Sequence, residues 1–79
     1  MTRENILEKM HPIFLDVFEL DEIQLTESLT AKDVDGWDSL THIQLVVALE
    51  KQFGVRFSST EIQNWENIGA IAEAVQSKL

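Results

Sequence analysis

The chain has 79 residues, 44% of them hydrophobic, with fourteen acidic and six basic residues, a net charge of −8 and no cysteine. One domain, residues 1–79, with a thin core leaves no room for a deep substrate cleft, and the missing cysteine excludes disulfides, thiolate metal sites and a cysteine nucleophile. An acidic surface repels phosphate backbones and anionic lipids, so we expect basic protein surfaces as partners, and neither nucleic acid nor membrane.

The first segment predicts a kinked helix from about residue 3 to residue 19. Its apolar residues recur in steps of three and four from Ile6 to Phe18, which is the helical period. Thr2 suits the N-cap position at its start. Pro12 removes a backbone donor inside the helix but falls outside the apolar stripe, so we expect a kink there.

Residues 20–38 show no sustained period and predict a long loop with a short helical turn near residues 30–34. Such a loop is uncommon in a small domain unless it has contacts of its own. We expect five scattered apolar side chains to hold it across the helices: Leu20, Ile23, Leu25, Leu29 and Val34.

A second helix is predicted from about Ser39 to Phe53, capped by Asp38 or Ser39 and ended by Gly54. Its apolar residues exceed what one buried stripe needs and divide into two faces. One face comprises Leu45, Val46, Leu49 and Phe53. The other comprises Leu40, Ile43 and Val47. A small bundle cannot fully bury both faces, so one of them is left for a partner.

Two further helices complete the expected fold. Ser58 and Glu61 form a capping box that opens a short helix near residues 59–64, and Asn67 caps a last helix of about residues 68–78. The sequence therefore predicts an all-α domain, a small four-helix bundle of three main helices and one short helix with a long first loop.

The stretch D-V-D-G-W-D-S-L, residues 33–40, gathers three aspartates, a glycine and a serine. In a calcium loop the glycine is sixth, and oxygen ligands stand first, third, fifth and twelfth. With Gly36 sixth, these positions hold Ala31, Asp33, Asp35 and His42. Both end ligands are missing, so the register excludes this calcium site and we predict no metal.

A hydrolytic site built on Ser39 and His42 is the second possibility, since the two residues lie three apart on one predicted helix. The chain has no G-x-S-x-G motif, no evident acid to orient the histidine and no oxyanion-hole motif. We therefore assign no catalytic residue and interpret His42 as a surface residue of the first helical turn.

Attachment of a group to Ser39 is the third possibility. Serine is also among the commonest N-cap residues, so the motif alone does not decide. Its setting adds weight, because the serine opens a helix after a long loop, in an acidic bundle without cysteine. The surplus apolar face also begins at the next residue, Leu40.

With these features the chain resembles discrete carriers of the acyl carrier protein family. The resemblance covers nearly the whole chain and centres on G-W-D-S-L-T-H-I-Q-L-V-V-A-L-E-K-Q-F-G-V, residues 36–55. It implies a 4′-phosphopantetheine arm, attached covalently to Ser39 from coenzyme A by a phosphopantetheinyl transferase, whose thiol carries acyl groups as thioesters. At Ser39 the phosphodiester would lie among free N–H groups at a helix start, with the serine as both cap and attachment point.

The resemblance also makes the second helix the docking surface for the transferase and for enzymes that load and process acyl groups. It implies that Asp38 helps to engage the modifying enzyme. The expected partner-binding residues are Trp37, Leu40, Ile43, Gln44, Val47 and Glu50. Core packing stays open for Leu40, Ile43 and Val47, because periodicity cannot separate core from interface. Packing on the loop stays open for Trp37.

Fatty-acid carriers usually have acids where this chain has Thr41, Gln44 and Lys51. Weaker charge steering favours a specialised fatty-acid or polyketide-type pathway. The cargo is selected by the loading enzyme, so a carrier of aminoacyl, peptidyl or D-alanyl groups stays open. An unmodified helical adaptor, which would bind partners through the apolar face and would not need Ser39, also stays open.

Whether an acyl chain folds back between the helices is also open. No apolar run approaches membrane-spanning length, and we expect a cytoplasmic monomer.

Overall fold

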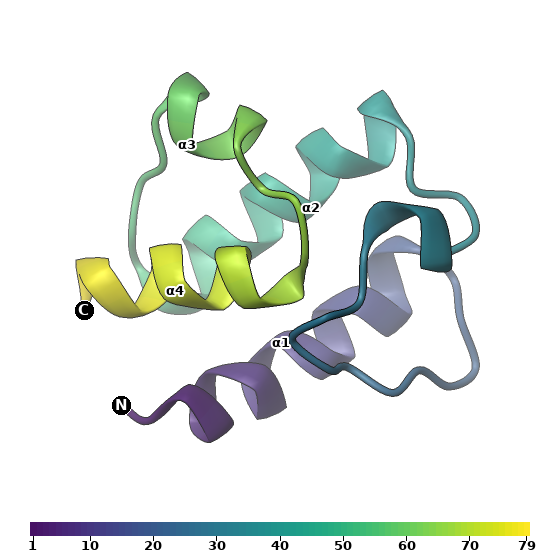
Figure 1. Cartoon of the computed structure of the whole chain (residues 1–79), viewed down its shortest axis with the longest axis horizontal. Coiled ribbons are helices and arrows are strands. Elements are labelled where there is room, and N and C mark those ends of the chain that lie inside the picture. Colours follow the sequence, from purple (N-terminus) through teal and green to yellow (C-terminus); the bar gives the residue numbers. More distant parts are fainter.

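The computed structural model describes all 79 residues and contains helices but no strand (Figure 1). Helix α1 packs against both α2 and α4, and the short α3 lies beside them in the connection between α2 and α4 (Figure 1). The all-α four-helix architecture predicted from the sequence is confirmed. The elements in chain order are α1 (Arg3–Val17), the 3-10 turn η1 (Ala31–Asp33), α2 (Ser39–Phe53), α3 (Ser59–Gln63) and α4 (Ile68–Lys78).

Side-chain caps set the start of every α-helix. Thr2, Asp38, Ser58 and Asn67 each accept a hydrogen bond from a backbone N–H of the first turn that follows. These four bonds satisfy donors that have no partner within the helix. The helix starts predicted from the sequence are confirmed.

Helix α1 ends at Val17, two residues before its predicted end. Glu19 adopts a left-handed conformation with φ 54°, and the N–H of Leu20 turns back to the carbonyl of Leu15 at 2.9 Å. A left-handed residue that ends a helix in this way is usually glycine. The helix continues through Pro12, whose side chain is exposed, and the kink there stays a prediction.

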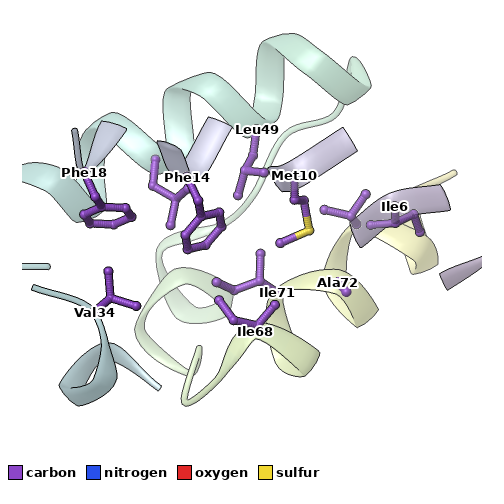
Figure 2. Close-up of a cluster of buried hydrophobic side chains, with 11 residues drawn as sticks. Ile6, Met10, Phe14, Phe18, Val34, Leu49, Ile68, Ile71 and Ala72 are labelled. Carbon is purple, nitrogen blue, oxygen red and sulfur yellow. The ribbon is translucent and has the colours of Figure 1, made fainter. Parts of the chain in front are cut away.

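One core joins α1, α2 and α4. Figure 2 shows Phe14 of α1 and Phe18, the residue that caps the end of α1, facing Val34 of the long loop. Helix α2 turns Leu45 and Leu49 into this core, so its opposite face points away from the other helices. The buried members of the core are Ile6, Met10, Phe14, Phe18, Val34, Leu45, Leu49, Ile68, Ile71, Ala72 and Val75.

The long loop is fixed to the bundle by its backbone as well as by its side chains. The carbonyls of Leu29 and Glu27 accept the N–H groups of Ile68 and Gly69, each at 2.9 Å, and so cap the first turn of α4. The predicted packing of the five apolar loop residues is confirmed, since Val34 is buried and the other four are partly buried against the core. The loop therefore enters α2 from a fixed position. None of the helices combines the length and the apolar character needed to cross a membrane.

Candidate functional site

Ser39 is the first residue of α2, and its side chain is exposed. The residue before it, Asp38, is the N-cap, and its Oδ1 accepts the N–H groups of Leu40 and Thr41, each at 3.0 Å. Of the two predicted caps, Asp38 is confirmed; the expectation that Ser39 is itself a cap is wrong, because the aspartate accepts these N–H groups. The Ser39 hydroxyl makes no hydrogen bond within the protein, and its side chain is exposed to solvent.

Thr41 holds the loop before Ser39 against the helix. Its Oγ1 accepts the N–H of Asp38 at 2.8 Å and donates to the carbonyl of Gly36 at 2.7 Å. Gly36 sits at φ 85°, a left-handed conformation that suits glycine. Asp38 and Thr41 thus satisfy each other's backbone donors as a capping box does. Sequence reasoning missed this role, although the D-x-x-T spacing was the signal for it.

His42 is half-buried, so its interpretation as a surface residue is wrong. The indole Nε1–H of Trp37 donates to Nδ1 of His42 at 3.0 Å, and Nε2 of His42 lies 3.3 Å from the carbonyl of Ile62. An indole only donates and a carbonyl only accepts, so the imidazole proton is on Nε2. Both ring nitrogens are engaged, and neither is free to act as a base for Ser39.

The carboxylate of Asp38 is stabilised in its charged form. Hydrogen bonds from the Thr41 backbone, then from the Thr41 side chain and the Leu40 backbone, lower the pKa of Asp38 below its usual value. With Leu40 and Thr41 N–H groups taken, only the N–H of Ser39 is left without a partner in the first turn. The expected set of free N–H groups for a phosphate is therefore reduced to one, beside a negative charge.

The second face of α2 is exposed. Leu40, Ile43 and Val47, together called the apolar face below, are 65%, 62% and 47% exposed, so core packing does not account for them. Gln44 is exposed beside them. Glu50 is half-buried, and its carboxylate accepts the N–H of Phe57 at 3.0 Å, so it anchors the loop after α2.

Trp37 packs inward. Its ring lies 5.7 Å from that of Phe14 and 5.3 Å from that of Phe18, measured between centroids, which places it against the core. The sequence left packing on the loop open for Trp37, whereas these aromatic contacts are with Phe14 and Phe18. Trp37 is a bulky residue at the end of the loop. Its contacts hold the part of the loop just before Ser39 against the end of α1.

Two open hollows border the site. One, of about 530 Å³, is lined by Trp37, Asp38, Ser39, His42, Ile43 and Gln63. The other, of about 750 Å³, lies between the end of α1 and α2, with Ile43 and Val47 on one side and Asp16 and Glu19 on the other. Gln63 of α3 was not predicted as a site residue, since only the fold brings it near Ser39. No group of three or more His, Cys, Asp or Glu side chains is placed to hold a metal ion.

Comparison with known proteins gives the family. The family model described as "Phosphopantetheine attachment site" matches residues 8–75. The chain belongs to the acyl carrier protein family. It is 32% identical to the acyl carrier protein of Thermotoga maritima over 78 residues, which is 99% of this chain and 96% of that protein. It is 30% identical to the acyl carrier protein of Thermosynechococcus vestitus over 80 residues, 100% of this chain and 98% of that one.

The fold agrees with a solved structure of the same family. The solution structure of the holo acyl carrier protein from Geobacter metallireducens has a TM-score of 0.86 and 41% sequence identity, and the match covers 92% of this chain and 84% of that chain. The resemblance read from residues 36–55 is therefore confirmed. The family and this holo neighbour support covalently bound 4′-phosphopantetheine as the cofactor.

The Thr41 hydroxyl can be tested by a matched pair of substitutions. Thr41→Val removes two hydrogen bonds and leaves the Gly36 carbonyl and the Asp38 N–H without these partners, so we expect the free energy of unfolding to fall by about 1–2 kcal/mol. Thr41→Ser keeps the hydroxyl and should lose less than half of that. Urea unfolding at neutral pH measures both variants, and equal losses in the two would show that the hydroxyl is not what holds the loop.

The lowered pKa of Asp38 predicts a dependence of stability on pH. A depressed folded-state pKa means that the carboxylate stabilises the fold above its unfolded pKa of about 3.9, and that this contribution is lost as the pH falls through the lowered value. Asp38→Asn keeps a good N-cap residue without the titrating charge. We expect the variant to lose less stability than the wild type between pH 7 and pH 2, measured by urea midpoints. An unchanged acid profile would contradict the role given to this carboxylate.

Proposed function

We propose that Ser39 carries the 4′-phosphopantetheine arm, and that this protein shuttles acyl thioesters between partner enzymes without catalysing their reactions. The observation that carries the proposal is the exposed, unbonded hydroxyl of Ser39 at the start of a 15-residue helix. The arm supplies the thiol, so a chain without cysteine suits this role. The open hollow beside Ser39 leaves room for the arm.

The local charges favour modification by a basic enzyme. Ser39 offers its own N–H and the positive end of the α2 dipole to a phosphate, which is favourable for an anion. The ionised carboxylate of Asp38 lies next to it and opposes the added charge. An enzyme that brings cations to this end of α2 offsets that repulsion, which is the role we assign to a basic phosphopantetheinyl transferase.

The acidic rim of the docking surface comes from the end of α1 and the residues just after it. Thr41, Gln44 and Lys51 leave α2 poor in acids, but Asp16 and Glu19 border the larger hollow across from Ile43 and Val47. An apolar face with acids along one edge is complementary to a partner surface with an apolar centre and a basic edge. We assign this surface to the cytoplasmic enzymes that load and process the cargo, with Leu40 and Gln44 beside it.

This arrangement favours a specialised fatty-acid or polyketide-type pathway. With acids supplied from α1, recognition depends on how two helices are placed and not on one acidic helix alone. A partner that reads both elements discriminates between carriers better than one that reads only charge on α2. The enzymes of such a pathway would therefore be dedicated to this carrier.

Modification is tested by incubating the protein with coenzyme A and a broad-specificity phosphopantetheinyl transferase, followed by intact-mass measurement. We expect the wild type to gain one phosphopantetheinyl group and Ser39→Ala to gain none. The alanine variant keeps the Asp38–Thr41 capping box, so circular dichroism should show an unchanged helix content. No gain in the wild type, with the transferase active on another carrier, would overturn the proposal.

The acidic rim is tested by charge reversal. Asp16→Lys combined with Glu19→Lys should lower the rate of arm transfer at low salt by about tenfold, and the difference should shrink as salt is raised, since steering by exposed charges is screened. Glu8→Lys combined with Glu73→Lys makes the same change in net charge at exposed positions outside the hollow. Equal effects of the two double variants would show that only net charge matters and that this rim has no special part.

A further inference from the structure

A row of aromatic rings runs from the loop before α2, through α2, to the residues on either side of α3. We call Trp37, His42, Trp65 and Phe57 the aromatic wall. Between ring centroids, Trp37 lies 6.1 Å from His42, His42 lies 5.7 Å from Trp65, and Trp65 lies 4.9 Å from Phe57. The last two contacts are edge-to-face, a favourable arrangement for aromatic pairs.

The wall is fastened on both sides of α3. His42 Nε2 bonds to the carbonyl of Ile62, which ties α3 to α2. Lys78 of α4 lies 3.0 Å from the carboxylate of Glu61, and its ammonium is 5.8 Å from the ring centroid of Phe57. For an acyl chain to pass between α2 and α3, these contacts would have to separate.

The interior behind the wall is already occupied by side chains. Leu45 and Leu49 of α2, and Ile68 and Ile71 of α4, are fully buried. The five hollows of the molecule all open to solvent, and His42 is one of the residues that line the hollow beside Ser39. A close-packed interior does not accept extra methylene groups unless side chains or backbone shift, which is unfavourable.

We infer that the acyl cargo stays outside the bundle, in the hollow lined by Trp37, Ile43 and Gln63, and that the protein carries short or polar acyl groups. This inference rests on the proposed attachment at Ser39. The arm begins at the edge of the hollow, so its effective concentration there is high. Gln63 offers an exposed amide that can both donate and accept, which suits the amide groups of the arm, while Ile43 and the Trp37 ring offer apolar contact. A long alkyl chain would find no shielded site here.

The two tryptophans provide separate reporters of the two positions. Trp37 lines the outer hollow, whereas the indole nitrogen of Trp65 is shut off from solvent and has no hydrogen-bond partner. The experiment transfers butyryl- and dodecanoyl-phosphopantetheine from the corresponding coenzyme A thioesters to the protein and confirms each by intact mass. Two-dimensional NMR then records both indole N–H resonances and the Gln63 side-chain amide.

We expect the Trp37 and Gln63 resonances to shift on loading, and the Trp65 resonance to stay the same for both chains. We also expect hydroxylamine to cleave the two thioesters at rates within about threefold of each other, because an interior site would gain with every methylene buried and would protect the longer chain far more. The variant Trp65→Leu, which shortens the wall, should give the longer chain added protection.

Three different results would contradict either the outer position of the cargo or the attachment to Ser39, and each can be told from the others. A Trp65 shift that grows with chain length would show that the cargo enters the bundle. No shift at Trp37 or Gln63 would show that the hollow does not hold it. A protein that accepts no arm at all would instead contradict the proposed attachment to Ser39.

Discussion

The two hydrogen bonds from the first turn of α2 to the Asp38 carboxylate determine the rest of the site. An exposed helix start needs an acceptor for its N–H groups, and a serine at that point commonly supplies it. Here the aspartate supplies it one residue earlier, so Ser39 becomes the first helical residue with its hydroxyl unused. The proposed attachment site at Ser39 therefore depends on the helix being capped by the residue before it.

Thr41 extends this arrangement from the helix into the loop. The Thr41 hydroxyl bonds to both the Asp38 N–H and the Gly36 carbonyl, so it ties the turn before Ser39 to the first turn of α2. Trp37, between them, is bonded to His42 and packed on α1. The proposed attachment point, Ser39, is thus exposed while the backbone on both sides of it is held in place, so a flexible arm attached there would start from a fixed position.

The sequence predicted the features that are local in the chain. Caps, helical periods and the left-handed residue after α2 depend on neighbours within a few positions, and the boundaries of α2 and α4 follow from them. The bond from His42 to Ile62 joins residues 20 apart, and the one from Ile68 to Leu29 joins residues farther apart still. No periodicity encodes such pairings. Ser39 could be chosen because its motif is contiguous, while Gln63 could not.

Which of the two apolar faces of α2 is buried could be decided only from the fold. Periodicity showed two apolar stripes, but only the positions of α1 and α4 decide which stripe is covered. Helix α1 ended earlier than its pattern indicated because a left-handed Glu19 closes it. That same residue then stands at the rim of the hollow beside Ile43. A local deviation in the backbone thus supplies part of the charge that α2 lacks.

An exposed apolar face is a liability for a small protein, since identical faces attract one another. Three apolar side chains that are about half exposed or more lie along one helix here. The net charge of −8 opposes self-association by mutual repulsion, which helps to keep this face uncovered. The acidic surplus therefore has two effects that follow from one property. It repels other copies of the carrier, and it would attract partner enzymes that present the basic surface proposed above.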